Sequence, residues 1–310
     1  MRYFLGVDGG QSSTTAVIGD EHGRTIGWAT AGPCNHVAAA EARTKFLRAM
    51  RECISQAAER AGLEAVGGRW PFEAACLGMS GGTADKSEIL HELLISDHIQ
   101  ITDDPMIALA GATGGKPGIV VIAGTGSIAF GRNARGETAR AGGWGFIFGD
   151  EGSAFDIARQ GLRAIMREYE GWGGHTALTP AYLAATGAAD PYELLHLFYK
   201  PEWPRSRVAH LAKVVDRTAE EGDPVAAGVM HLAAQQLAMF ATSVHRQLFA
   251  KDDAVRISWA GGVFQSRLLL DRFRSLISLE SEGAPPEHGP ATGALILAWR
   301  AAGITVSPHP

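Results

Sequence analysis

Three glycine-rich turns, each directly after an apolar run, are the segments of this chain best suited to chemistry. They are Asp8-Gly9-Gly10-Gln11-Ser12-Ser13-Thr14, Gly124-Thr125-Gly126-Ser127 and Ala260-Gly261-Gly262-Val263. Because glycine has no Cβ, backbone N–H groups in such turns can closely surround the oxygens of a phosphate group. A single turn of this kind is ordinary, but three of them, two with hydroxyl residues, favour a phosphate-binding protein.

Two familiar phosphate motifs fit this chain less well. Residues 111–116, Gly-Ala-Thr-Gly-Gly-Lys, resemble a P-loop but are one residue short, and Pro117 stands where Ser or Thr must bind magnesium. Residues 124–129 resemble a dinucleotide fingerprint, which must open a helix, whereas here a strand and a turn are predicted to follow. The turns therefore indicate neither a P-loop nor a Rossmann protein.

Four acidic residues stand at positions suited to chemistry. Asp8 ends the first apolar run, where a carboxylate suits a hard cation that keeps its water. Asp104 precedes Pro105, a pattern typical of a helix N-cap with proline at the first helical position, whereas Asp103 would point the other way along a strand. Asp150 and Glu151 could complement the dipole at the start of a helix.

The elements that must position these residues follow from the hydrophobic pattern. Strands alternating with tight turns are predicted over residues 4–30, then a helix over 37–61 and strands at 74–79 and 99–102. The first strand–loop–strand plan returns at 119–131, about 115 residues later, which indicates two lobes built on one unit. Helices over 151–169, 224–249, 266–279 and 291–302, with a strand at 255–259, complete an α/β class, while 171–207 shows less regular patterning.

Composition excludes several classes of protein. The length of 310 residues favours two domains, and 46% hydrophobic residues exclude a disordered chain. A net charge of −5 lacks the excess of basic residues that is typical of nucleic-acid-binding proteins. No apolar run approaches the roughly 18 residues of a membrane span. An acid already at position 8 disfavours a signal peptide, and three scattered cysteines read as reduced thiols, so we expect a cytoplasmic protein.

The motifs together carry a resemblance to a known group of ATPases. The turns at 8–14, 124–127 and 261–262, with Asp104, resemble the phosphate-1, phosphate-2, adenosine and catalytic-aspartate motifs of the actin/hexokinase/Hsp70 superfamily. More narrowly, Gly142-Gly143-Trp144-Gly145 followed by Gly149-Asp150-Glu151-Gly152-Ser153 resembles the N-acetylglucosamine kinase family, which groups with the BadF/BadG/BcrA/BcrD-type ATPases. Gln11-Ser12 departs from the Gly-Thr usual in that family.

The resemblance implies a fold and a reaction. The fold would be a two-lobed actin-like ATPase (ribonuclease H-like) with an interdomain cleft, an N-terminal lobe over 1–113 and a C-terminal lobe over 114–310, the last helix packing back on the first lobe. The reaction would be phosphoryl transfer from ATP with Mg²⁺ to an amino sugar, by default N-acetylglucosamine at O6. Glucosamine, N-acetylmuramic acid and glucose stay open as substrates, and a non-kinase ATPase activator or regulator stays open as a different class.

The resemblance also implies roles for individual residues. Asp104 would be the catalytic base, and Asp8 would hold Mg²⁺ through water. The residues implied for ATP are Gly9, Gly10, Gln11, Ser12, Ser13, Thr14, Gly124, Thr125, Gly126, Ser127, Gly261 and Gly262. Those implied for the sugar are Asn35, His36, Ser80, Gly81, Asp104, Gly126, Asp150 and Glu151. The expected partner is a small-molecule sugar, with neither nucleic acid nor membrane, and the family pattern is compatible with a homodimer.

Overall fold

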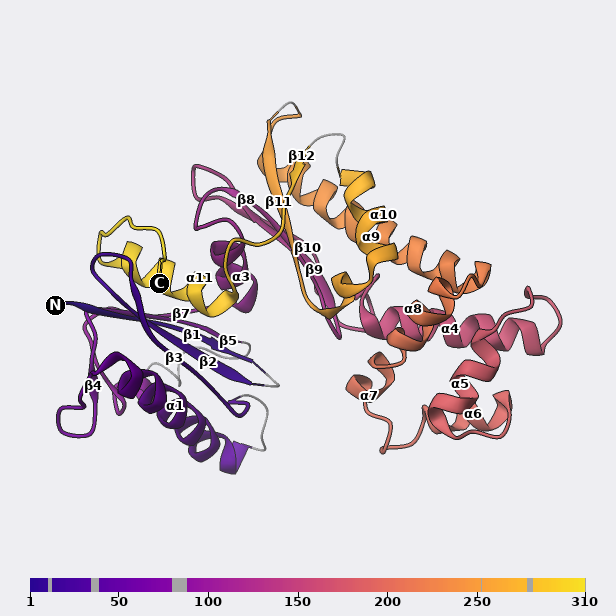
Figure 1. Ribbon diagram of the computed structural model, residues 1–310, viewed down its shortest axis with the longest axis horizontal. Coiled ribbons are helices and arrows are strands. Elements are labelled where there is room, and N and C mark those ends of the chain that lie inside the picture. The colour runs from indigo at the N-terminus through magenta and orange to yellow at the C-terminus, as the bar shows by residue number, and fades with distance from the viewer. Residues whose placement is uncertain (11–12, 35–38, 80–87, 252, 278–280, 310) are drawn as a thin grey trace. The chain divides into compact units, whose positions relative to one another are not determined.

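A computed structural model describes residues 1–10, 13–34, 39–79, 88–251, 253–277 and 281–309 (Figure 1). The chain forms two compact units, of which unit 1 comprises Met1–Lys116 with Pro285–Pro310, and unit 2 comprises Pro117–Ala284. Each unit is an α/β structure, as the alternation of strands and helices predicts. The first break follows Lys116, three residues beyond the predicted boundary, and the segment from Pro285 groups with unit 1.

Unit 1 is built on a five-stranded sheet in the order β3-β2-β1-β5-β7. Its strands are β1 (Tyr3–Gly9), β2 (Thr14–Asp20), β3 (Thr25–Ala31), β5 (Ala74–Met79) and β7 (Ile99–Thr102). The first three are antiparallel neighbours, whereas β5 runs parallel to both β1 and β7. In register, Asp8 of β1 pairs with Gly78 of β5, which pairs with Thr102 of β7, so the carboxyl ends of three strands meet at one edge. A separate parallel pair joins β4 (Trp70–Pro71) to β6 (Leu94–Ile95).

Helices cover both faces of this sheet (Figure 1). On one face lies α1 (Ala39–Ala61), whose residues Phe46, Met50 and Ile54 recur at the predicted helical spacing and are buried against the sheet. The other face carries α3 (Asp104–Ala112) and α11 (Pro290–Ala301). The approach of α11 to β1 is so close that a Cβ at Gly6 would lie 2.2 Å from the Leu295 nitrogen. The last helix is therefore part of the packing of unit 1.

Unit 2 repeats the same plan. Its sheet has the order β10-β9-β8-β11-β12, with β8 (Gly118–Ala123), β9 (Ser127–Arg132), β10 (Thr138–Gly142), β11 (Val255–Ala260) and β12 (Ser281–Gly283). Again the first three strands are antiparallel neighbours. Strand β11 runs parallel to the central strand β8, and β12 runs parallel to β11. The predicted strand–loop–strand repeat is confirmed by this equivalence of the two sheets.

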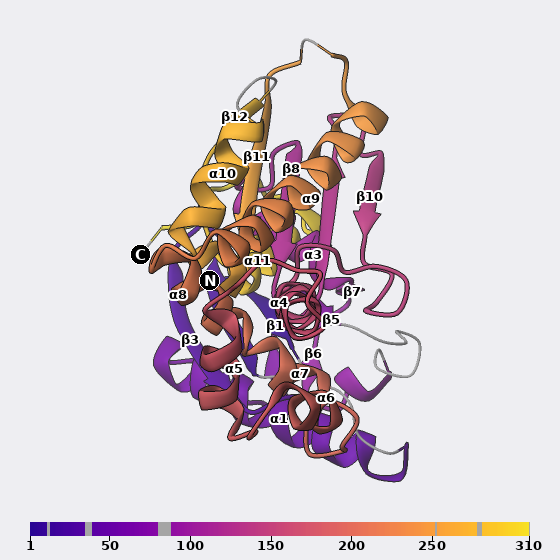
Figure 2. The same cartoon turned by 90° about the vertical axis from the view of Figure 1, so that its right-hand side faces the viewer.

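Most helices among the described residues belong to unit 2 (Figure 2). They are α4 (Ala154–Tyr169), α5 (Leu178–Thr186), α6 (Pro191–Leu197), α7 (Arg205–Ala209), α8 (Ala212–Glu220), α9 (Pro224–Leu248), the 3₁₀ helix η1 (Gly262–Gln265) and α10 (Arg267–Ile277). Three of them, α5 to α7, fall where the sequence predicts less regular structure. Helix α4 begins three residues later than predicted because Ser153 is its N-cap, with Oγ accepting from the Asp156 N–H at 3.2 Å.

The apolar character of α9 is explained by packing. The expectation that no segment approaches the length of a membrane span is wrong for α9, which is the one helix among the described residues that is long and apolar enough to cross a membrane by length and composition alone. Its inner face, including Met230, Leu237 and Val244, lies in the hydrophobic core of unit 2.

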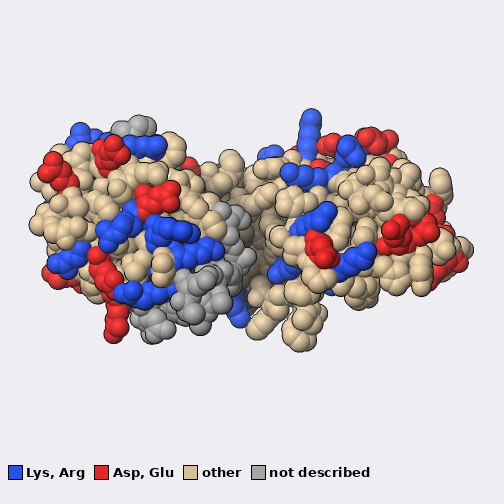
Figure 3. Space-filling model, turned by 90° about the horizontal axis from the view of Figure 1, so that it is seen from below, with Lys and Arg blue, Asp and Glu red and all other residues tan. Residues whose placement is uncertain are grey.

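On the face shown in Figure 3, acidic and basic side chains are interspersed on both units.

Candidate active site

The loop Gly124–Ser127 is a tight connection between two antiparallel strands of unit 2. Ala123 of β8 pairs with Ser127 of β9, and the Gly124 N–H donates to the Gly126 carbonyl at 2.9 Å. The N–H groups of Thr125 and Gly126 donate to no acceptor in the described part of the chain. A strand rather than a helix follows, as predicted, so this loop is no dinucleotide fingerprint. Its two N–H donors are suited to binding an anion.

Gly124, in this loop, and Gly262, near it, have open space where a side chain would be. A Cβ at Gly124 or Gly262 would meet no atom within 4 Å, and neither residue has a positive φ. Gly261 differs, because its φ is +101° and a Cβ there would lie 2.3 Å from the Ala123 carbonyl oxygen. Close packing of β8 and β11 therefore explains glycine at 261, whereas the folded backbone gives no reason for glycine at 124 or 262.

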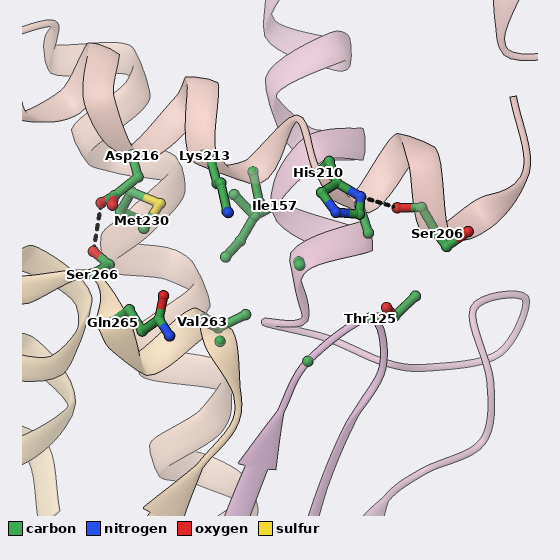
Figure 4. Close-up of a pocket in the computed structure, with 15 residues that line it drawn as sticks. Thr125, Ile157, Ser206, His210, Lys213, Asp216, Met230, Val263, Gln265 and Ser266 are labelled. Carbon is green, nitrogen blue, oxygen red and sulfur yellow. Dashed lines mark hydrogen bonds between the residues drawn. The ribbon is translucent and has the colours of Figure 1, made fainter. Parts of the chain in front are cut away.

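A pocket of about 650 Å³ lies against these two glycines within unit 2 (Figure 4). Lys213 and Asp216 reach it from α8, and the Ser266 hydroxyl donates to Asp216 at 2.5 Å. Ile157 and Met230 supply apolar surface. Such a pocket, apolar with a few convergent polar groups, has the size and character of a small-molecule site. It is lined by Gly124, Thr125, Ala154, Ile157, Ser206, Ala209, His210, Ala212, Lys213, Asp216, Met230, Gly262, Val263, Gln265 and Ser266.

Asp150 lies directly on the same loop. Its side chain is buried, its Oδ1 accepts from the Ser127 N–H at 3.3 Å, and its carboxylate forms an ion pair with Arg205. With φ of 63°, it is the one non-glycine residue with a positive φ in the described ranges. The Ser127 hydroxyl in turn donates to the Glu151 carbonyl at 2.6 Å. Three hydrogen bonds thus join the segment that holds the predicted sugar acids to the phosphate loop, the third running from the Ala154 N–H to the Gly124 carbonyl at 2.8 Å.

Unit 1 holds a second group of predicted residues, centred on Asp8 and Asp104. Asp8 is partly buried near the end of β1, and burial together with the charge of Asp104 raises the pKa of Asp8 to about 6. The predicted N-cap role of Asp104 is wrong, because Asp103 takes the N-cap position and Asp104 is the first residue of α3, with Pro105 second. The Asp103 side chain makes no capping hydrogen bond. Asp104 is thereby placed on the helix that follows β7, at the edge where β1 ends.

The first glycine turn is described in part. The Gly10 N–H donates to the Ser13 carbonyl at 2.9 Å, closing the turn that follows Gly9. The Thr14 side chain, expected near phosphate, is fully buried and donates to the Gly32 carbonyl at 2.9 Å, so its hydroxyl serves the fold. The remaining predicted residues of unit 1 lie outside the described residues: Gln11, Ser12, Asn35, His36, Ser80 and Gly81.

Comparison with known proteins identifies the family. The model of the BadF/BadG/BcrA/BcrD ATPase family matches residues 5–298. The chain belongs to this ATPase family. It is 31% identical over 285 residues to the N-acetylmuramic acid/N-acetylglucosamine kinase of Clostridium acetobutylicum, covering 90% of this chain and 91% of that one. It is 27% identical to the N-acetyl-D-glucosamine kinase of Dictyostelium discoideum, covering 95% and 97% of the two chains.

A solved structure shares the fold of this family member along the whole chain. It comes from Chromobacterium violaceum and is assigned as an N-acetylglucosamine kinase, with 27% identity and a TM-score of 0.76 over 96% of this chain and 99% of that one. The resemblance inferred from the sequence motifs is confirmed by these matches, and so is the two-lobed ATPase fold class.

The acids of this ATPase suit a metal that is bound with few protein ligands. Within the described residues, no three or more His, Cys, Asp and Glu side chains are grouped to hold a metal ion. Mg²⁺ is commonly bound by one or two carboxylates, with waters and nucleotide phosphate oxygens as the other ligands. Asp8, a single carboxylate near the end of β1, fits that description.

Several residues of the site were not predicted from the sequence. Arg205, Lys213 and Asp216 belong to α7 and α8, some 80 or more residues after the loop they approach. No spacing or motif marks them, because single charged residues on short helices are common on protein surfaces. Only the packing of α7 and α8 beside the β8–β9 loop brings them to the site.

Proposed function

We propose that this protein transfers the terminal phosphoryl group of ATP to a hydroxyl of an amino sugar, with O6 of N-acetylglucosamine as the main acceptor. The observation that carries the proposal is the pocket of unit 2, where Gly124 and Gly262 leave open space beside two available N–H donors. Membership of an ATPase family supports ATP as the donor. The names of the relatives, kinases of N-acetylglucosamine and N-acetylmuramic acid, support an amino sugar as the acceptor.

Unit 2 is proposed to bind the nucleotide. The N–H groups of Thr125 and Gly126 would donate to phosphate oxygens, since they have no acceptor among the described residues. Lys213 and Asp216 extend from α8 into the pocket, where their charges could pair with phosphate and ribose hydroxyl groups respectively (Figure 4). Val263, at the same wall, is mostly buried and offers apolar contact to a base.

Unit 1 is proposed to supply the acids of the reaction. Asp104 would accept the proton of the attacking sugar hydroxyl, as an aspartate does in other phosphoryl transfers. Asp8 would hold a Mg²⁺ ion through water, and that ion would offset the negative charge of the phosphates. Gly9, Gly10 and Ser13, in the first turn, would add main-chain contacts to phosphate. Catalysis of this kind depends mainly on positioning and charge.

The sugar is proposed to contact residues that follow several strand ends. Asn35, His36, Ser80, Gly81 and Gly126 form the first part of this set. Asp150 and Glu151 complete it as hydrogen-bond acceptors for hydroxyl or amide N–H groups. Asp150 already has two protein partners, but a carboxylate has about four acceptor positions, so it retains capacity for a sugar.

The alternative function, that of a non-kinase ATPase that activates a reductase, is disfavoured by the burial and spacing of the cysteines. Such activators hold an iron–sulfur cluster through accessible thiolates. Here Cys34, Cys53 and Cys76 are all buried, and burial raises the pKa of Cys53 to about 11 and that of Cys76 to about 12. The three cysteines are also widely separated along the chain, with no close pair of the kind that commonly holds such a cluster.

A coupled ADP-release assay tests the proposal. The acceptors compared are N-acetylglucosamine, N-acetylmuramic acid, glucosamine and glucose, with a control that lacks sugar. We expect kcat/KM for N-acetylglucosamine to exceed that for glucose by about tenfold or more, because buried polar groups left unpaired by glucose penalise it. Equal ADP release with and without sugar would overturn the kinase assignment. A higher kcat/KM for glucose or glucosamine would overturn the choice of substrate alone.

A further inference from the structure

Arg205, the first residue of α7, connects the phosphate loop to Asp150. Its Nη2 donates to the Thr125 carbonyl at 3.0 Å and also forms the ion pair with Asp150. The guanidinium group lies 5.1 Å from the centre of the Phe146 ring and 5.7 Å from that of Phe155. These two rings contact each other edge to face, at 5.3 Å between centres. The cation is therefore held by one carboxylate, one carbonyl and two aromatic faces.

The pairing leaves no spare room at Gly126. A Cβ at Gly126 would lie 3.0 Å from Arg205 Nη2 and 3.0 Å from each carboxylate oxygen of Asp150. The side chain of Asp150 is 5% exposed, whereas that of Arg205 is 32% exposed. Asp150 therefore has its charge balanced at contact distance by a cation that still reaches solvent. The buried Nε of Arg205 has no hydrogen-bond partner within the described residues.

We propose that Arg205 is a positioning residue that also decides which amino sugar the site accepts, an inference that rests on the proposed function. The charge of the Asp150 carboxylate is balanced by Arg205, and in this state the carboxylate accepts hydrogen bonds from the sugar. A hydroxyl or acetamide N–H group can donate to its remaining lone pairs without electrostatic penalty. A protonated amine at the same place would lie within a few Å of the guanidinium group, where burial leaves the repulsion poorly screened. The site therefore takes the uncharged N-acetylated sugar in preference to protonated glucosamine.

A purely structural role for Arg205 can be separated from this one, because the chain contains a matched pair. Arg159 binds buried Asp156 at 2.6 Å, with side chains that are 31% and 3% exposed. Arg159 also lies over the Phe155 ring, at 5.9 Å. Its described contacts do not include residues 124–127. Replacing Arg159 thus removes a similar ion pair from the same region without changing the charge beside Asp150.

The experiment measures selectivity, defined as kcat/KM for N-acetylglucosamine divided by kcat/KM for glucosamine, at pH about 7, where an aliphatic amine is largely protonated. Arg205→Gln is expected to lower this ratio by about tenfold or more, because the unbalanced carboxylate then favours the ammonium group. Arg205→Lys should keep the ratio within about threefold of wild type, and Arg159→Gln should leave it unchanged even if both activities fall. An Arg205→Gln ratio equal to wild type, or an equal shift in Arg159→Gln, overturns the inference.

A double variant keeps the test decisive if Arg205→Gln folds poorly with an unbalanced buried carboxylate. Arg205→Gln combined with Asp150→Asn removes both charges, and its ratio should return to within about threefold of wild type. A double variant whose ratio stays as low as that of Arg205→Gln would contradict the inference. Wild-type protein that phosphorylates neither sugar overturns the proposed function, and this inference with it. Wild-type kinase activity with an unshifted variant ratio overturns this inference alone.

Discussion

Asp8 lies beside Asp104 in unit 1, and the charge of Asp104 adds to burial in raising the pKa of Asp8 to about 6. Asp8 lies near the end of β1 and Asp104 begins α3 just after β7, and the parallel alignment of β1, β5 and β7 brings these strand ends to one edge of the sheet. A fold that gathers like charges at one place costs stability, and such costs are typical of sites that a cation will occupy.

The first prediction concerns the stability of an Asp8→Asn variant. The pKa of Asp8 is raised from 3.8 to about 6, so its contribution to stability is fully present below about pH 3.8 and is lost as the pH rises through about 6. Ionised Asp8 therefore destabilises the protein at pH about 7.5. Without Mg²⁺ or nucleotide, Asp8→Asn should raise the free energy of unfolding there by about 1–2 kcal/mol. Urea denaturation measures this, and an equal gain at pH about 4 would contradict it.

The second prediction concerns the pH dependence of activity. If Asp8 must be ionised to hold Mg²⁺, kcat/KM for ATP should fall as the pH is lowered through about 6, which is the pKa of Asp8 in the protein without ligands. Raising the Mg²⁺ concentration should move the midpoint of kcat to lower pH, because the cation stabilises the carboxylate form. Initial rates between pH about 5 and 8 measure this. A wild-type midpoint retained in Asp8→Asn would assign the titration to another group.

The third prediction concerns the proposed base. Asp104→Asn should lower kcat by roughly two to four decades, because a general base is lost, while the amide keeps the volume of the carboxylate. Affinity for ATP, measured by calorimetry, should change little. Asp103→Asn is the matched control, since its side chain makes no capping hydrogen bond at the start of α3. Near-normal turnover in purified Asp104→Asn would remove Asp104 from the mechanism.

The fourth prediction concerns the open glycines of the pocket. Gly262→Val should fold normally, because a Cβ there meets no atom within 4 Å, yet it should weaken ATP binding by about tenfold or more by filling the nucleotide path. Gly124→Val should behave in the same way. Gly228→Val in α9 is the control, since it also has open space but does not line the pocket. Unchanged ATP affinity in both pocket variants would mean that the nucleotide binds elsewhere.

Much of the architecture is readable from local pattern. The apolar runs that end at Asp8 and Ala123, each followed by glycines and a second β-branched or apolar run, predict the β1–β2 and β8–β9 units that the structure contains. Helices α1 and α9 were predicted to within a few residues, because long amphipathic or apolar segments carry their own periodicity. Glycine turns and acids at strand ends likewise mark the candidate site, since they reflect backbone geometry over a few residues.

Tertiary structure decided the rest, because it depends on contacts between distant segments. Helix α11 was predicted from its local pattern and its return to the first lobe from the family resemblance, whereas its close approach to β1 at Gly6 depends on packing between distant segments. The short helices α5 to α7 were missed because segments of five to nine residues are stabilised by packing more than by their own propensity. Arg205 reaches Asp150 and the Thr125 carbonyl only through that packing, across 55 and 80 residues of chain. Sequence motifs therefore predict which loops can bind phosphate. The charges that surround each acidic residue depend on side chains from distant segments, and only the tertiary structure shows which of them pack there.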